Sequence, residues 1–260
     1  MIDYVIMAGV TISSSEEFVN SLIAHSFVEA QKKLGTDELV KSLISNIFLD
    51  RDICTIVSLV GGAASGKSTL AGLMIKRLQR QGWAADSIST DDYVIGDRIY
   101  RREHLEGREP RAKYDFNLLN MKIAQIRNNR NSKLKIAVPT YDEANGIAVA
   151  AGEEKFIHKI GKVDVLIIEG DFYEVTDPDL AIFLDVSDEQ RLRSRVARDV
   201  EHRNEADTSK IVENFHIRQA AQHLPYTLPA AEHADLIVRG NFVGKRWSYD
   251  VFRVKTSEPS

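Results

Sequence analysis

Eight consecutive residues constrain the fold of this chain more than any other feature of its sequence. They read Gly61-Gly62-Ala63-Ala64-Ser65-Gly66-Lys67-Ser68 and fit the pattern G-x-x-x-x-G-K-[ST]. An apolar run over residues 53–60 precedes them, and a helical pattern begins at Thr69. Glycines let the backbone curl so that several N–H groups face one phosphate, and the following helix N-terminus adds positive potential. The sequence therefore predicts a phosphate-binding loop between a strand and a helix.

The motif also predicts roles for individual side chains of the loop. Lys67 is expected to reach the outer phosphates of ATP, and the Ser68 hydroxyl to hold Mg²⁺. Thr69 opens the helix beside them. We therefore expect residues 61–69 to form the nucleotide site, with ATP and Mg²⁺ as cofactors.

Short apolar runs alternate with helical patterns beyond the loop, which is typical of a parallel sheet covered on both faces. The predicted strands are residues 53–60, 135–138, 163–168, 181–184 and 235–238. Residues 87–93 are expected at the end of a further strand, the next one after the helix that follows the loop. We expect an α/β fold with a doubly wound, mainly parallel sheet of the P-loop NTPase type.

The predicted organisation of the chain has three parts. Residues 1–50 form an N-terminal helical extension, in which helices over 18–34 and 39–47 pair as a hairpin. Residues 51–245 form the main domain, and residues 141–160 make a hairpin excursion from it. Residues 246–260 form a C-terminal strand and a frayed tail.

Composition narrows the classes of partner. The 260 residues are 43% hydrophobic and 28% charged, which is typical of a globular protein. The net charge of -4 gives no overall electrostatic reason to bind nucleic acid or an anionic membrane. No run approaches the roughly 18 apolar residues that span a bilayer, and the single Cys54 points to a reducing compartment. We expect a cytoplasmic protein without nucleic-acid or membrane partners, and a homo-oligomer stays open.

Two acidic positions follow predicted strands. Asp91, with Asp92 beside it, comes after the strand that should lie next to the loop. A kinase needs a carboxylate near the acceptor hydroxyl to receive its proton, and Asp91 is the candidate base. Glu169 ends the most hydrophobic strand, where a carboxylate serves Mg²⁺, usually through water.

An arginine stripe runs along residues 188–203. Arg191, Arg195 and Arg198 share one helical face, and Arg203 follows where the helix should end. One interpretation is a solvated helix whose arginines pair with neighbouring acids. The other, which the preceding P-loop favours, is a lid helix that closes over the transferred phosphate.

Taken together, these features resemble the uridine kinase, phosphoribulokinase and pantothenate kinase group of P-loop kinases, and uridine kinase most closely. The resemblance covers roughly residues 54 to 240. Its landmarks are the loop and residues 90–93, 113–116, 138–142, 168–170, 191–199 and 234–238.

The resemblance implies an ATP-dependent kinase that phosphorylates a hydroxyl group of a small molecule, a nucleoside first of all. It implies that Asp91 is the general base and that Lys67, Arg195 and Arg198 are catalytic. It adds Arg203 to the nucleotide site. It places the acceptor against Tyr93, Asp115, Tyr141 and Arg198.

Three departures from the uridine kinase pattern keep other acceptors open. Residues 143–146 stand where a phenylalanine and a base-reading histidine are usual, and Glu205 replaces a further lid arginine. The segment 98–113 is either a mobile solvated loop or, because it is basic, a site for an acceptor with its own anion. Pantothenate, a phosphorylated pentose or another sugar or polyol is the alternative acceptor. A non-catalytic, nucleotide-binding regulatory protein is the alternative from another class.

Overall fold

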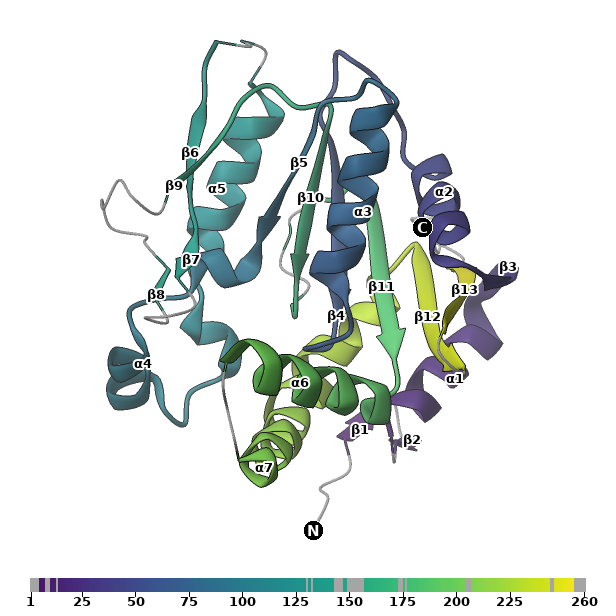
Figure 1. Cartoon of the computed structure of the whole chain (residues 1–260), viewed down its shortest axis with the longest axis vertical. Coiled ribbons are helices and arrows are strands. Elements are labelled where there is room, and N and C mark those ends of the chain that lie inside the picture. Colours follow the sequence, from purple (N-terminus) through teal and green to yellow (C-terminus); the bar gives the residue numbers. More distant parts are fainter. Residues whose placement is uncertain are drawn as a thin grey trace. The chain divides into compact units, whose positions relative to one another are not determined.

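The computed structural model describes residues 5–7, 10–12, 14–129, 131, 133–142, 147–148, 157–172, 175, 177–203, 207–243 and 246–254. Its largest sheet has the strand order β3-β13-β12-β11-β4-β10-β5 (Figure 1). These strands are β3 (Phe27–Leu34), β4 (Thr55–Gly61), β5 (Ala85–Ser89), β10 (Val165–Gly170), β11 (Leu180–Val186), β12 (Leu236–Val243) and β13 (Arg246–Val254).

Helical segments connect and flank these strands. The α-helices are α1 (Ser15–Ser26), α2 (Thr36–Ser45), α3 (Lys67–Arg80), α4 (Arg98–Leu105), α5 (Phe116–Arg127), α6 (Asp188–Arg203) and α7 (Thr208–Arg218). Shorter or irregular helical turns are η1 (Thr90–Tyr93), η2 (Pro110–Lys113), the π-helix η4 (Gln219–Thr227) and η5 (Leu228–His233).

Among the described residues, three small antiparallel strand pairs lie outside the large sheet. They are β1 (Val5–Met7) with β2 (Val10–Ile12), β6 (Ile136–Pro139) with β9 (Ile157–Ile160), and β7 (Tyr141–Asp142) with β8 (Ile147–Ala148).

The chain divides into two compact units. The first contains residues 1–42, 60–67 and 181–260, and the second contains residues 43–59 and 68–180.

In the first unit, β11 and β12 are parallel, whereas β13 pairs antiparallel with both β12 and β3. Every residue of β11 is buried, as expected for a strand covered on both faces. The last strand lies in the segment expected to hold one, and residues 255–260, expected to be frayed, lie outside the described residues.

In the second unit, β10 and β5 are parallel, and Glu169 is the register partner of Ser89. Every residue of β10 is buried. A hydrophobic cluster that includes Ile88, Leu119 and Leu166 packs around these strands. Because parallel strands end at one edge of a sheet, this register brings Glu169 next to the turn η1.

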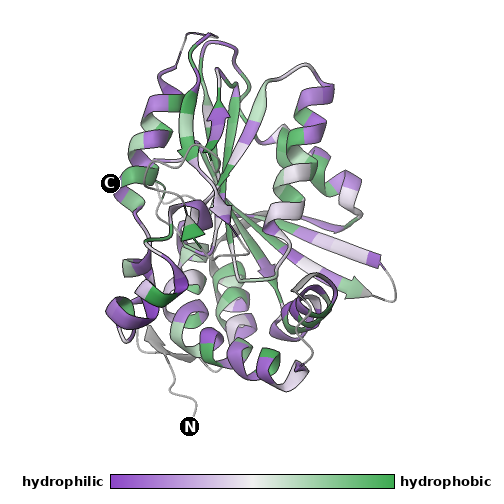
Figure 2. Ribbon diagram, turned by 60° about the vertical axis from the view of Figure 1, so that its left-hand side comes forward, coloured by the Kyte–Doolittle hydropathy of each residue, from purple (hydrophilic) through white to green (hydrophobic). Residues whose placement is uncertain are grey.

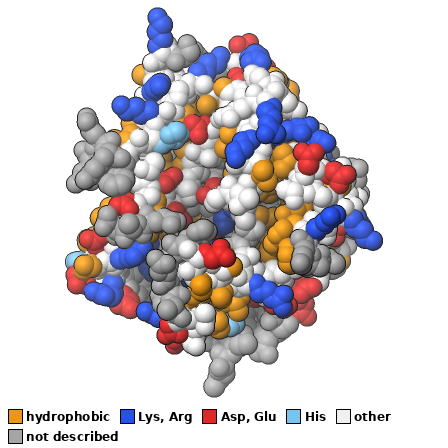
Figure 3. Space-filling model, in the orientation of Figure 1, with side chains coloured by type: hydrophobic (Ala, Val, Ile, Leu, Met, Phe, Trp, Pro, Cys, Tyr) orange, Lys and Arg blue, Asp and Glu red, His pale blue; other side chains and the backbone are white. Residues whose placement is uncertain are grey.

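The prediction of a doubly wound, mainly parallel α/β sheet is confirmed. Figure 2 shows the pattern behind it, with hydrophobic residues along the strands and helices that are hydrophobic on one side and hydrophilic on the other. On the face shown in Figure 3, the described basic and acidic side chains are interspersed. None of the described helices combines the length and the apolar character that crossing a bilayer requires.

Two sequence predictions about elements are wrong. The helix predicted over residues 18–34 ends at Ser26, and Phe27–Leu34 forms strand β3 instead, so the N-terminal helices α1 and α2 do not make a simple hairpin. The strand predicted at residues 135–138 forms as β6, but it pairs antiparallel with β9 outside the large sheet. The excursion over residues 141–160 contains the β7–β8 pair, and residues 143–146 and 149–156 lie outside the described residues.

Candidate active site

The phosphate-binding loop forms where the sequence predicts it, between the last residue of β4 and the first residue of α3. Two of its residues have left-handed backbones, Ala64 with φ of 64° and Gly66 with φ of 93°. The amide of Ser65 donates to the carbonyl of Gly62 at 3.1 Å. Residues whose backbones alternate between right-handed and left-handed conformations direct successive N–H groups toward one side, and this arrangement makes an anion-binding concavity.

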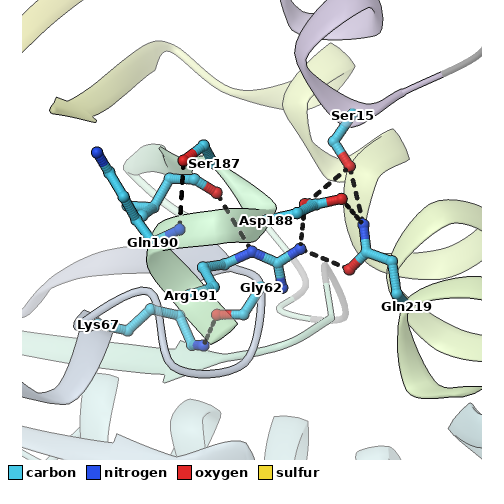
Figure 4. A network of polar contacts seen from close by, with 9 residues as sticks. Ser15, Gly62, Lys67, Ser187, Asp188, Gln190, Arg191 and Gln219 are labelled. Atoms are coloured by element: carbon cyan, nitrogen blue, oxygen red, sulfur yellow. Dashed lines mark hydrogen bonds and ion pairs between the residues drawn. The ribbon is translucent and has the colours of Figure 1, made fainter. Parts of the chain in front are cut away.

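Lys67 places its charge inside this loop. Its side chain is buried, and Nζ donates to the carbonyl oxygen of Gly62 at 3.1 Å (Figure 4). The segment thus combines a curled backbone, a helix N-terminus and an ammonium group, which are the donors that the phosphates of a nucleotide require. The other residues expected to bind nucleotide differ in exposure: Gly61 and Ser65 are buried, Ala63 is half-buried and Thr69 is exposed.

Ser68 and Glu169 meet within the second unit. The Ser68 hydroxyl donates to Glu169 Oε1 at 3.1 Å, and Glu169 is buried at the end of β10. Both side chains offer oxygen, which Mg²⁺ prefers. Within the described part of the chain, no three His, Cys, Asp or Glu side chains gather as a metal site. The pair fits Mg²⁺, since this ion usually keeps several waters and binds through one or two carboxylates and phosphates.

The turn η1 gives Asp91 and Asp92 different surroundings. Asp92 accepts from the amides of Tyr141 at 2.7 Å and Ser89 at 3.1 Å. Burial raises the pKa of Asp92 to about 6, and the charge of nearby Glu169 adds to this rise. The two amide hydrogen bonds and His158 act in the opposite direction and lower the pKa. Asp91 is exposed, and its carboxylate accepts from the Tyr114 hydroxyl at 3.3 Å. Asp92 therefore holds β7 to the turn, while Asp91 faces solvent.

Tyr114 is a residue that sequence reasoning missed. Its ring stacks on Phe116, with centroids 5.5 Å apart, and meets Phe172 edge-on at 5.3 Å. These contacts fix the ring whose hydroxyl reaches Asp91. The sequence held a signal, because Tyr114 lies in one of the landmark segments, 113–116.

The residues predicted to contact the acceptor have local structural roles as well. Asp115 is the N-cap of α5, where Oδ1 accepts from the amide of Leu118 at 2.8 Å. Tyr141 is half-buried in β7. Tyr93 is fully buried, its hydroxyl has no hydrogen-bond partner among the described residues, and burial raises its pKa above the ordinary value.

The helix α6 carries the predicted lid arginines. Arg195 Nε lies 3.4 Å from Asp199 Oδ2, and Arg198 Nε donates to Asp199 Oδ1 at 3.0 Å. Arg195 is buried, and this burial lowers the pKa of its guanidinium, with a further contribution from the charge of Arg218. Arg198 is 42% exposed. The Arg203 side chain lies outside the described side chains.

Arg191 and His223 approach the phosphate-binding loop itself. A Cβ atom placed on Gly62 would lie 2.7 Å from Arg191 Cζ and 2.9 Å from His223 Cε1. Burial, followed by the charges of Arg191 and Lys67, lowers the pKa of His223 well below its ordinary value, so its imidazole is neutral at pH 7. His223 Nδ1 has no hydrogen-bond partner among the described residues. Sequence reasoning missed His223, because no motif or spacing marks it.

Known proteins match most of this chain. The profile of the Phosphoribulokinase / Uridine kinase family matches residues 56–242. A uridine kinase from Macrococcus caseolyticus is 28% identical over 192 residues, which are 71% of this chain and 87% of that one. Uridine-cytidine kinase B from Dictyostelium discoideum is 29% identical over 194 residues, which are 70% of this chain and 73% of that one.

A solved structure supports the fold. Phosphoribulokinase from Rhodobacter spheroides superimposes with a TM-score of 0.54 at 16% sequence identity, and the match covers 80% of this chain and 82% of that one. The two chains thus share a fold.

Proposed function

The chain belongs to the phosphoribulokinase / uridine kinase family, and from that premise we propose that it transfers the γ-phosphoryl group of ATP to a hydroxyl group of a nucleoside. Membership makes it a phosphotransferase with an alcohol group as acceptor. The observation that carries the proposal is the curled loop with buried Lys67, inside the matched region. The nucleoside is supported by the names of the relatives, uridine kinase and uridine-cytidine kinase.

The phosphates of ATP would be bound by the backbone of residues 61–66 and by Lys67, with Ser68 and Thr69 at the start of α3. Ser68 and Glu169 would hold Mg²⁺, with the distance of 3.1 Å between their oxygens as support. Bound Mg²⁺ supplies positive charge that offsets the negative charge of the phosphate oxygens.

Proton transfer is assigned to Asp91. The acceptor oxygen forms a bond to the γ-phosphorus, the bond from that phosphorus to the β,γ-bridging oxygen breaks, and ADP leaves. The hydroxyl proton of the acceptor passes to the Asp91 carboxylate. The Tyr114 hydroxyl supports this role, because its hydrogen bond to Asp91 fixes the direction of the carboxylate.

Arg195, Arg198 and Arg203 of α6 would contact the phosphates, and Arg198 also the acceptor. Arg195 and Arg198 both pair with Asp199, so a bound anion would have to share their N–H groups with that carboxylate. A ribose diol would bind Asp115, and a base would lie against Tyr141. Tyr93 is fully buried, so we propose that it supports the turn rather than touching the acceptor.

The test is a panel of acceptors with ADP release as the readout. Nucleosides, pantothenate, phosphorylated pentoses and polyols are added separately to protein, ATP and Mg²⁺. We expect acceptor-dependent ADP release with uridine or cytidine, and none with the Lys67→Ala variant. For the active nucleoside, Asp115→Ala should raise KM roughly 10- to 100-fold by removing a charged hydrogen-bond acceptor, with KM for ATP unchanged.

The other outcomes distinguish the alternatives. If ADP is released with pantothenate, a phosphorylated pentose or a polyol but with no nucleoside, the chain is a kinase whose acceptor is not a nucleoside. Nucleotide binding without ADP release for any acceptor would favour a regulatory protein.

A further inference from the structure

Arg191 has surroundings that differ from those of the other arginines of α6. Its side chain is 2% exposed and is among the largest fully buried ones of the described chain. Removing a guanidinium from water costs free energy unless its N–H groups are satisfied and its charge is paired. Arg191 therefore has a defined position rather than a solvated, variable one.

Hydrogen bonds fix the guanidinium on three sides. Nε donates to the carbonyl of Val186 at 3.2 Å, and Nη2 donates to Asp188 Oδ1 at 2.7 Å and to Gln219 Oε1 at 2.5 Å. Its Cζ also lies 5.3 Å from the centre of the Phe215 ring. The ion pair with Asp188 offsets the charge of Arg191. The main effect of the network is therefore to fix the position and orientation of the guanidinium.

The remaining nitrogen of the guanidinium, Nη1, lies against Gly62 of the phosphate-binding loop. A Cβ atom at position 62 would approach Nη1 and Cζ of Arg191 more closely than 3.0 Å, so any larger residue there would force the guanidinium to move. The carbonyl of the same Gly62 accepts from both Lys67 Nζ and the Ser65 amide, each at 3.1 Å. The position of residue 62 thus influences both the lysine and the curl of the loop.

The network reaches the N-terminal helix through Ser15. Gln219 Nε2 donates to Ser15 Oγ at 3.0 Å and to Asp188 Oδ2 at 2.8 Å, and Ser15 Oγ lies 3.5 Å from Asp188 Oδ1 (Figure 4). Ser15 is buried in the first turn of α1. It precedes the region that the family profile matches, residues 56–242.

We propose that Arg191 is a positioning residue of the phosphate-binding loop, and that Ser15, through Gln219 and Asp188, sets the place of its guanidinium. The affinity for nucleotide then depends on a helix that lies outside the region matched by the family profile. This inference rests on the proposed function only in requiring that the loop binds ATP; it does not depend on which acceptor is phosphorylated.

The experiment measures the Kd of Mg·ATP by calorimetric titration of the full chain, without any acceptor. We expect Ser15→Ala and Gln219→Ala each to raise Kd, roughly 2- to 30-fold, the range observed for residues that modulate a site without touching its ligand. Arg191→Lys keeps the charge but cannot make the same hydrogen bonds, and should raise Kd at least as much. Arg193→Ala is the matched control: it lies on the same helix, is 73% exposed and pairs with Glu189, and should bind as the parent does.

A double variant separates positioning from general loss of stability. If Ser15 and Gln219 act through one network, the double substitution should raise Kd no more than the larger single effect, whereas independent effects multiply. Thermal unfolding without nucleotide checks that each variant folds, and Ser15→Ala keeps the inference testable should Arg191→Lys fail to fold. If Ser15→Ala binds Mg·ATP with the Kd of the parent, or if the effects of Ser15→Ala and Gln219→Ala on Kd multiply in the double variant, this inference is wrong while the proposed function stands. If the parent itself binds no ATP, both the inference and the proposed function are wrong.

Discussion

Asp91 and Asp92 are neighbours in one short turn, but their carboxylates have different partners. Asp92 Oδ1 and Oδ2 accept from the amides of Tyr141 and Ser89, whereas exposed Asp91 accepts from the Tyr114 hydroxyl. A general base must approach its substrate, so the exposed carboxylate suits that role.

Substitution of the two aspartates should therefore give different defects. Asp91→Asn keeps the size of the side chain but removes the proton acceptor, so kcat should fall roughly 10²- to 10⁴-fold with ATP binding retained. Asp92→Asn should affect mainly the stability of the turn. Steady-state kinetics and ATP titration of both variants test this. Near-parental turnover of Asp91→Asn beside an inactive, folded Asp92→Asn would reverse the assignment.

The raised pKa of Asp92 predicts a pH dependence of stability. Its pKa is about 6 in the folded protein against 3.8 for an ordinary aspartate, so the folded state binds the proton more tightly. The contribution of Asp92 to stability is then fully present below about pH 4 and is lost as the pH rises through 6. Between pH 5 and 7.5, the parent should lose stability relative to Asp92→Asn.

Denaturant unfolding of both proteins across this pH range measures the difference. Asp91→Asn serves as the matched control from the same turn. A parent and an Asp92→Asn variant with parallel pH profiles would show that Asp92 does not titrate in this range.

Along α6, the three arginines of the predicted stripe have different surroundings. Arg191 is buried beside the loop, while Arg195 and Arg198 meet at Asp199 one turn or more further along. A sequence stripe puts all three on one face, but it does not tell which part of that face is covered.

The lid interpretation predicts a specific kinetic defect for Arg198→Ala. If Arg198 contacts the charge that develops on the transferred phosphoryl group, its loss should lower kcat more than it weakens ATP binding. Asp199 keeps Arg195 as a partner in this variant. Arg193→Ala, exposed on the same helix, is the control. An unchanged kcat would return Arg198 to the solvated face of the helix.

The strand β3 shows where prediction from sequence failed. Residues 27–34 have apolar positions compatible with a helix, but their backbone pairs with β13, whose residues come more than two hundred positions later. Strand formation depends on such partners more than on local preference. The P-loop, β4 and β10 were predictable, because a local motif and continuous apolar runs specify them.

The same distinction holds for the site. Lys67 and Ser68 follow from the motif, and Glu169 from the end of an apolar strand. The bond from Tyr114 to Asp91 spans 23 residues, and the bond from Gln219 to Ser15 spans 204. Periodicity is read in windows of about 11–18 residues, which are too short to contain both partners of either bond, so only the fold reveals them.

Binding of ATP should raise the free energy of unfolding of the whole protein. ATP at 100 times its Kd stabilises a folded protein by about 2.7 kcal/mol, which corresponds to a rise in Tm of roughly 5–10 °C for a chain of this size. Scanning calorimetry with ATP and Mg²⁺ should show this rise. Removing Mg²⁺ with a chelator should reduce it.

The Lys67→Ala variant should lose most of this rise, because it lacks the buried ammonium of the loop. Lys76→Ala, an exposed lysine on the same helix α3, should keep it. Equal rises in the two variants would mean that ATP binds elsewhere.

Strand order determines how far the chain can be shortened. The family profile ends at residue 242 and begins at residue 56, so a protein cut to those limits lacks both β3 and β13. The row of N–H and C=O groups on β12 that now pairs with β13 would become a bare sheet edge, which recruits strands from other molecules. Light scattering should show that such a protein self-associates, whereas the full chain covers β12 with β13 and β13 with β3.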